Sequence, residues 1–249
     1  MTESEQMDDE EKLRFEEFKR KINGEAARAQ VGKLEYTLTE ASSDKAVIRR
    51  ACQDATLLGL GAVCVLPALV KPCVSFLGTD PQVSLIACIS YPHGGDSTKI
   101  KVAAVKQAIK DGIDECEVTA PISYIKDGNW NYVKREFKKL KSASKGRGIR
   151  INLESVLLTE QELVKVCNIA AAVGITALRT DSGFYGGGFD AEIVSRIKAA
   201  VKDKCTVKAD NVNTLTEMQT AVDMGAGVIG SKNAADVART ILAAAEMDI

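Results

Sequence analysis

Short apolar runs rich in β-branched residues recur along the chain, and polar segments with helical spacing separate them. Runs of this length are typical of strands, whereas apolar residues three and four positions apart indicate helices that bury one face. The predicted strands are residues 34–38, 62–66, 83–89, 115–119, 149–153, 175–178, 205–209 and 227–229. Eight strands alternating with helices predict an α/β fold, a single (β/α)8 barrel. A doubly wound open sheet is the alternative, but no GxGxxG motif follows the first strand.

The helical segments carry recognisable ends. Two of them open with a capping box, Thr159 with Glu162 and Thr214 with Glu217, in which side chains and backbone amides satisfy each other. A single Asp or Asn precedes four other helical segments as a predicted N-cap. These residues are Asp44, Asp96, Asp190 and Asn233. Between the second and third strands, residues 67–78 contain Pro72, which argues against a long helix there.

Residues 1–30 differ from the rest of the chain because they are highly charged, with a few strong apolar side chains at Leu13, Phe15, Phe18 and Ile22. This composition predicts an extra N-terminal helix or arm, with Gly24 as a hinge. The predicted organisation is therefore an arm at 1–30 and a barrel domain at 31–249.

Composition narrows the class of protein. The 249 residues are 45% hydrophobic and carry a formal net charge of −1, so no excess of basic residues indicates nucleic-acid binding. No apolar run is long enough to span a membrane. The acidic start is unlike a signal peptide. The seven cysteines lack metal-binding spacing, which predicts buried free thiols in a cytoplasmic protein. We expect no metal and no cofactor.

Few polar residues stand at the carboxyl ends of the predicted strands, where (β/α)8 barrels place their active sites. They are Glu117, Asn152, Glu154, Arg179 and Lys208. Two carboxylates and two cations at one barrel mouth indicate a candidate site. The alternative is a charge-balanced structural network, since buried charges must be paired.

From about residue 34 to the C-terminus, the chain resembles the deoxyribose-phosphate aldolases, a family of class I aldolases on (β/α)8 barrels. Ordered strings carry the resemblance: residues 62–67 (AVCVLP), 91–94 (YPHG), 112–115 (GIDE), 149–154, 174–183 and 207–209. The resemblance implies a Schiff-base lysine on strand six, a second lysine on strand seven that lowers its pKa, and a proton-relaying aspartate on strand four. It also implies 2-deoxyribose 5-phosphate as substrate, cleaved to glyceraldehyde 3-phosphate and acetaldehyde.

The chain departs from this pattern at the position of the nucleophile. Arg179 stands where the Schiff-base lysine is expected, and a guanidinium stays charged and cannot form an iminium. Lys208 matches the second lysine, and Glu117 replaces the aspartate with a side chain one methylene longer. These three are the catalytic positions that the resemblance implies.

The expected phosphate site also departs from the family. The glycine pair that should follow Lys208 is missing, and Asp210 places a negative charge where an anion should bind. The resemblance and the helix N-terminus after strand eight still give a set of candidate substrate-binding or anion-binding residues. These are Thr180, Asp181, Glu154, Gly230, Ser231 and Lys232.

Three functions remain open at this point. The favoured one is an aldolase homologue that has lost most of its activity and acts as a binding or scaffold protein, with a protein partner at its surface or arm. The second is an active aldolase whose Schiff base forms on Lys208, activated by Arg179. The third is a barrel enzyme for a carboxylate-bearing substrate, held by the Arg179 fork. The ligands expected are therefore a phosphosugar or a carboxylate, and the resemblance leaves a homodimer open.

Overall fold

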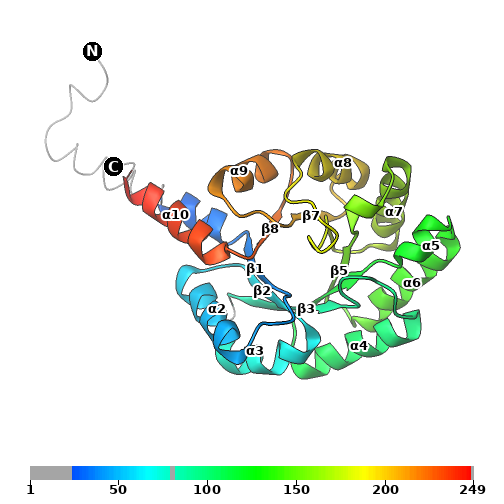
Figure 1. Ribbon diagram of the computed structural model, residues 1–249, viewed down its shortest axis with the longest axis horizontal. Helices are drawn as coiled ribbons and strands as arrows, with labels where there is room; N and C mark the ends of the chain where they lie inside the picture. The colour runs from blue at the N-terminus through cyan, green and yellow to red at the C-terminus, as the bar shows by residue number, and fades with distance from the viewer. Residues whose placement is uncertain (1–23, 79–81, 248–249) are drawn as a thin grey trace, which may run out of the picture.

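Eight parallel strands close into one barrel in sequence order in the computed structural model, which describes residues 24–78 and 82–247 (Figure 1). This confirms the predicted (β/α)8 barrel. The strands are β1 (Leu34–Leu38), β2 (Ala62–Val65), β3 (Ser84–Ile89), β4 (Glu115–Thr119), β5 (Gly148–Asn152), β6 (Ala177–Arg179), β7 (Thr206–Ala209) and β8 (Val228–Ser231).

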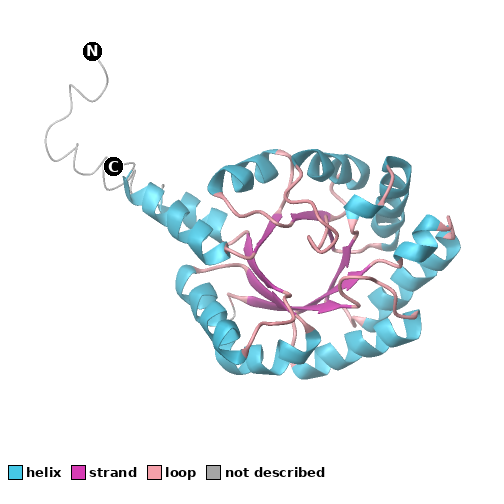
Figure 2. Cartoon of the chain, viewed as in Figure 1, coloured by secondary structure: helices cyan, strands magenta, loops and turns pink. Residues whose placement is uncertain are grey.

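Helices form an outer ring around the strands (Figure 2). They are α2 (Lys45–Leu58), α3 (Val70–Leu77), α4 (Thr98–Asp111), α5 (Ile122–Lys126), α6 (Trp130–Ala143), α7 (Glu160–Val173), α8 (Ala191–Val201), α9 (Leu215–Asp223) and α10 (Ala234–Met247). Pro72 lies within the short α3, in agreement with the prediction. Within the described ranges, no helix is both long and apolar enough to cross a membrane.

The described part of the predicted arm is helical. Residues 24–31 form a helix that buries Ala27 and Val31, and Gly24 is its first described residue. The hinge expected at Gly24 stays a prediction. The apolar residues predicted for the arm, Leu13 to Ile22, lie outside the described residues.

The caps at the helix ends agree with the sequence in most cases. Both capping boxes are present, at Thr159 and Thr214, and the Asp44 and Asp190 side chains accept hydrogen bonds from the first turns of α2 and α8. The prediction for Asp96 is wrong, because Ser97 is the N-cap of α4. Asp96 lies one residue too early, and its backbone N–H donates to Ser90 Oγ instead.

Alternate residues of each strand face the barrel interior, and the two halves of this interior differ in polarity. On β2 and β3, Ala62, Cys64, Ile86 and Cys88 form a small apolar cluster separate from the larger core between strands and helices. Strands β1, β4, β5, β6 and β7 contribute buried charges inside the barrel: Glu35, Glu117, Arg150, Arg179 and Lys208. All seven cysteines are buried free thiols, as predicted.

Candidate active site

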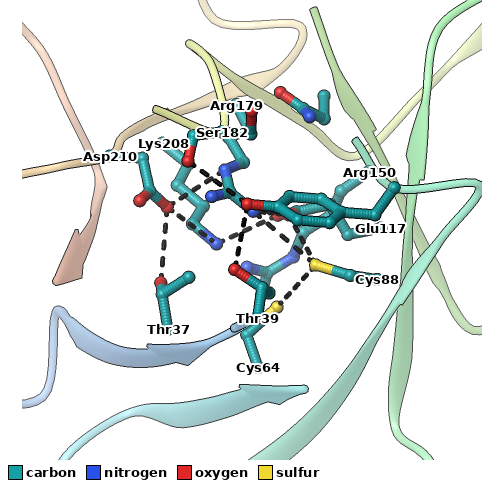
Figure 3. Close-up of polar contacts among 12 residues, drawn as sticks. Thr37, Thr39, Cys64, Cys88, Glu117, Arg150, Arg179, Ser182, Lys208 and Asp210 are labelled. Atoms are coloured by element: carbon teal, nitrogen blue, oxygen red, sulfur yellow. Dashed lines mark hydrogen bonds and ion pairs between the residues drawn. The ribbon is translucent and has the colours of Figure 1, made fainter. Parts of the chain in front are cut away.

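The three predicted catalytic positions meet inside the barrel. Arg179 on β6 and Lys208 on β7 are direct neighbours in the strand register. Glu117 from β4 joins them, because its Oε1 accepts from Arg179 Nη1 at 2.6 Å and its Oε2 accepts from Lys208 Nζ at 3.0 Å (Figure 3). All three side chains are at most 1% exposed. The sequence therefore identified the centre of the cluster correctly, although the roles of these residues stay predictions.

Two further carboxylates complete the cluster around the cations. Glu35 of β1 accepts a short hydrogen bond from Lys208 Nζ. Asp210, just after β7, lies 3.1 Å from Arg179 Nε and 3.4 Å from Lys208 Nζ. Each cation thus contacts at least two carboxylates, which compensates for the loss of hydration on burial.

Arg150 extends the cluster toward the amino ends of the strands. Its Nη1 donates to Glu35 at 2.6 Å and its Nη2 donates to Glu115 at 2.8 Å. Arg150 was not among the site residues predicted from the sequence. A signal was present, because Arg150 precedes Asn152 by two residues and therefore shares its face of β5.

The pKa values of the cluster favour the charged forms. Burial opposes ionisation of Glu117, but Lys208 and Arg179 outweigh it and hold the pKa of Glu117 well below its ordinary range. Burial likewise opposes the charge of Lys208, yet Glu117 and Glu35 raise the pKa of its ammonium well above the ordinary lysine value. Lys208 is therefore protonated, and a protonated amine is not a nucleophile.

Tyr91, after β3, covers the cluster from the mouth. The Arg179 Cζ atom lies 5.5 Å from the centre of the Tyr91 ring, in a cation–π contact. The Tyr91 hydroxyl accepts from Thr39 Oγ1 at 3.0 Å and donates to the Ser182 carbonyl at 3.2 Å. Tyr91 belongs to the YPHG string that carried the resemblance, but nothing in that string predicted that its ring would lie over Arg179.

A pocket of about 420 Å³ lies at the barrel mouth, with Tyr91 in its wall. We call it the mouth pocket. Its lining combines apolar side chains with a few polar groups, as is common for ligand pockets. The residues are Thr39, Glu40, Ala41, Leu66, Tyr91, Pro92, Ser182, Gly183, Phe184 and Lys232.

The predicted anion-binding residues at the end of β8 and directly after it lie in two environments. Lys232 reaches the mouth pocket, where it pairs with Glu40 at 2.7 Å. Gly230 instead faces Asp210, since an added Cβ there would lie 2.1 Å from Asp210 Oδ2. Ser231 is buried, and its Oγ accepts from the backbone of Asn233. A carboxylate thus occupies the space beside Gly230.

Thr180 and Asp181, the next two predicted binding residues, hydrogen-bond within the loops after β6 and β7. Thr180 Oγ1 accepts from the Asp210 backbone at 3.2 Å. Asp181 Oδ1 accepts from Gly183 N at 2.9 Å and from Asn211 Nδ2 at 2.7 Å. These contacts fix the two loops relative to each other.

Glu154, the last of the predicted set, is buried and also bonded within the mouth. Its carboxylate accepts from Asn152 Nδ2 at 2.7 Å and from Ser182 N at 3.3 Å. Glu154 has a φ of 48°, and the other mouth residues Ser90 and Asn211 have φ values of 57° and 61°. Non-glycine residues in this left-handed region store strain, which is often found at functional sites.

One group of side chains has the composition of a metal site. Cys64 Sγ lies 3.2 Å from Cys88 Sγ, which in turn lies 3.3 Å from Glu117 Oε1. Glu117 already accepts from Arg179 and Lys208, so an added cation would meet two positive charges at the same carboxylate. A hydrogen bond with Cys88, together with burial, holds the pKa of the Cys64 thiol well above its ordinary value. This environment fits a pair of packed cysteine side chains rather than a metal.

Asp181→Asn is expected to raise the free energy of unfolding at pH 7.5 by about 2–3 kcal/mol. Burial, with Asp210 nearby, raises the pKa of Asp181 from 3.8 to about 6. Because the folded state prefers the protonated acid, stability falls as the pH rises from 3.8 to about 6, and ionised Asp181 is a cost above that range. Denaturant unfolding at several pH values measures the difference, which should vanish below about pH 4. A gain of equal size at acidic pH would contradict this explanation.

The fold and this cluster define the class of protein. It is a (β/α)8 barrel with a cation–carboxylate cluster inside the barrel. Arg179 ends β6 and Lys208 lies one residue before the end of β7, at the end of the barrel where this fold places its active sites, and Glu117 reaches them from the middle of β4.

Comparisons with known proteins specify the family. No protein-family model matches the chain. It is 33% identical over 199 residues to the deoxyribose-phosphate aldolase of Clostridium botulinum (strain ATCC 19397 / Type A), covering 80% of this chain and 93% of that one. It is 31% identical over 213 residues to that of Lysinibacillus sphaericus (strain C3-41), covering 84% and 95%. The chain belongs to the deoxyribose-phosphate aldolase family.

Solved structures agree on the fold. The deoxyribose phosphate aldolase from Aeropyrum pernix superposes with a TM-score of 0.79 at 20% identity, covering 90% of this chain and 95% of that one. An aldolase named QR15 gives a TM-score of 0.83 at 24% identity, with 87% and 97% covered. At these identities the similarity establishes the barrel and leaves the reaction to the site residues.

Proposed function

We propose that this chain is a deoxyribose-phosphate aldolase homologue that has lost Schiff-base chemistry and works by binding. Arg179 carries the proposal, because it stands at the end of β6 where the resemblance expects the reactive lysine. It is fully buried, and it contacts Glu117 at 2.6 Å and Asp210 at 3.1 Å. A guanidinium held between two carboxylates stays protonated and forms no iminium.

An active enzyme that uses Lys208 instead has less support. Such an enzyme needs a neutral amine, and a nearby fixed cation such as Arg179 favours that form. In this cluster Glu117 and Glu35 outweigh Arg179 and raise the pKa of Lys208. The Lys208 side chain is also fully buried beneath the mouth.

Recognition of a substrate phosphate has less support for a separate reason. The Asp210 carboxylate lies against Gly230, next to the predicted anion site. A phosphate brought there would meet this negative charge at close range. Loss of the reactive amine and loss of the anion site together favour a binding role over cleavage of a phosphosugar.

The third function, a reaction on a carboxylate-bearing substrate, required the Arg179 fork to be free. Glu117 already contacts Arg179 Nη1 and Asp210 already contacts Nε. A bidentate contact with a substrate carboxylate would need two guanidinium nitrogens, so this function has less support. A protein partner at the surface or at the arm, and a homodimer, stay predictions from the sequence.

Trapping with acetaldehyde and borohydride tests the proposed function. Wild-type protein is expected to give no two-carbon adduct, because neither Arg179 nor protonated Lys208 attacks an aldehyde. Intact mass and peptide mapping provide the readout. The aldolase of Clostridium botulinum, treated in parallel, controls for the trapping chemistry. An adduct on Lys208, or cleavage of 2-deoxyribose 5-phosphate by the wild type, would overturn the proposal.

A further inference from the structure

We propose that the outer groove between α4 and α6 is a second binding site, which takes a small anion carrying two or more linked phosphate groups. The two helices lie side by side in the ring around the barrel (Figure 1). The inference goes beyond the proposed function, because none of the residues lining this groove lines the mouth pocket or belongs to the cluster inside the barrel.

The groove contains a pocket of about 350 Å³, which we call the lysine pocket. This volume lies within the usual range for small-molecule sites. Among the described residues that line the pocket, three are lysines and none is a carboxylate. The lining residues are Val102, Lys106, Lys139, Ser142, Ala143 and Lys145. The pocket therefore has the charge of an anion site.

The three lysines have no partner of their own. Within the described ranges, Lys106, Lys139 and Lys145 make no ion pair and no side-chain hydrogen bond. Arg196 on α8, by comparison, is paired with Glu192 at 2.6 Å. Three like charges around one pocket repel one another, and an anion between them would turn this repulsion into attraction.

The acids of the two helices are engaged elsewhere. The one acid of α4, Asp111, pairs with Lys71 at 3.3 Å. The one acid of α6, Glu136, is buried and accepts from Lys101 at 2.7 Å and from Thr98 at 2.7 Å. Neither carboxylate lines the lysine pocket. An anion brought there meets cations from both helices without a competing negative charge.

Lys145 is held at the pocket in a backbone conformation that suits glycine. Its φ is 52°, in the left-handed region, where glycines stand after α2, α4 and α7. The buried Ser144 hydroxyl fixes this turn, since it lies 2.9 Å from the Lys141 carbonyl and 3.0 Å from the Arg147 carbonyl. A lysine is strained in this region and glycine is not. What lysine adds at this position is an ammonium group beside the pocket.

The chemistry of the lining selects linked phosphates. Lysine binds phosphate as a point charge, whereas a single carboxylate is better matched by the planar fork of arginine, which this lining lacks. Solvent and salt screen each exposed lysine, so a singly charged anion would be held weakly. Linked phosphates carry several negative charges in one short molecule, which can therefore contact all three ammonium groups together.

Inorganic tripolyphosphate and orthophosphate test the proposal by isothermal titration calorimetry on the intact protein at low ionic strength. We expect tripolyphosphate to bind about tenfold more tightly than orthophosphate or better. The variant Lys106→Gln/Lys139→Gln/Lys145→Gln should weaken tripolyphosphate binding by about tenfold or more. Its matched control removes three exposed lysines that do not line the pocket, and it should weaken binding by less than about twofold. This control is Lys134→Gln/Lys138→Gln/Lys165→Gln.

Lys145→Gly separates binding from stability. Glycine relieves the left-handed conformation, so the midpoint of thermal unfolding should rise, while loss of the ammonium group should weaken tripolyphosphate binding several-fold. Unchanged binding in this variant, or equal losses in the triple variant and its control, would overturn the proposal. Orthophosphate that binds as tightly as tripolyphosphate would overturn the requirement for linked phosphates.

Adenosine triphosphate distinguishes the sources of the phosphate chain. An affinity equal to that of tripolyphosphate supports recognition of the chain alone, a higher affinity supports a nucleotide, and a much lower one supports an inorganic chain. Each of these outcomes requires loss of binding in the Lys106, Lys139 and Lys145 variant. Absence of binding by both compounds would overturn the proposal. A borohydride adduct on Lys208 bears only on the proposed function, so the two failures are distinguishable.

Discussion

Glu117→Gln is expected to lower the free energy of unfolding by about 3–5 kcal/mol, the typical cost of removing one partner of a buried ion pair. Glu117 is 1% exposed and contacts Arg179 and Lys208, both fully buried. Glutamine has nearly the same shape as glutamate but no charge. The buried positive charges of Arg179 and Lys208 would therefore lose one of the carboxylates that neutralise them. Chemical denaturation at pH 7 measures the loss.

Acid titration separates this cause from a change in packing. The cations hold the pKa of Glu117 in the folded protein below its ordinary range. Ionised Glu117 therefore contributes fully to the free energy of unfolding above its pKa in the unfolded chain, about 4.3, and this contribution is lost as the pH falls through its pKa in the folded protein. The difference between wild type and Glu117→Gln should therefore shrink in acid. A constant difference across pH would indicate packing, and a difference below about 1 kcal/mol would contradict the prediction.

Glu192→Gln is the matched control for this substitution. Glu192 pairs with Arg196 at 2.6 Å one helical turn away, but its side chain is 72% exposed. Because solvent screens exposed ion pairs, this substitution should leave the free energy of unfolding nearly unchanged. The Glu117–Arg179 and Glu192–Arg196 pairs have the same N–O distance of 2.6 Å, so a difference between the two substitutions reflects burial and not distance.

The fold could be predicted because its determinants are local in sequence. Each strand is a short apolar run, and the capping boxes at Thr159 and Thr214 need residues only three positions apart. The failure at Asp96 is instructive, because Asp96 and Ser97 are both good cap residues. The structure places Ser97 at the N-cap, and the segment alone did not specify which of the two residues would take that position.

The candidate site could be predicted only in part, because its contacts join distant segments. Arg179, Lys208 and Glu117 were identifiable from their places at strand ends and from the resemblance. The partner of Lys208, Glu35, is 173 positions away, and Arg150 is 115 positions from the same glutamate. Such pairs follow from barrel closure and from side-chain direction, which one strand read alone does not fix.

The closure of the mouth was even less accessible to sequence reasoning. Tyr91 covers Arg179 because Thr39 and Ser182, from loops 52 and 91 positions away, hold its hydroxyl. The sequence did indicate that Asp210 would oppose an anion. The structure adds that this carboxylate contacts both cations and lies against Gly230. One residue therefore compensates the charge of both cations and places a carboxylate beside Gly230.

Arg179→Lys is expected to change the protein from unreactive to trappable, with a two-carbon adduct on the introduced lysine after acetaldehyde and borohydride treatment. The shorter side chain can keep fewer of the contacts that Arg179 makes with Glu117 and Asp210. The Lys208 ammonium beside it would favour the neutral, nucleophilic amine. Peptide mapping against the wild type measures the gain. Lys101 serves as an internal control, because burial lowers its pKa but it is tied to Glu136 and the Thr119 carbonyl.

Cleavage of 2-deoxyribose 5-phosphate should remain undetectable in the same variant, because Asp210 still occupies the space beside Gly230. Adding Asp210→Gly removes that carboxylate, and the double variant is expected to show the first measurable cleavage. Cleavage by Arg179→Lys alone would mean that Asp210 does not block the phosphate. Absence of an adduct from a folded Arg179→Lys protein would mean that the mouth closed by Tyr91 prevents the reaction, and that the missing amine is not its principal defect.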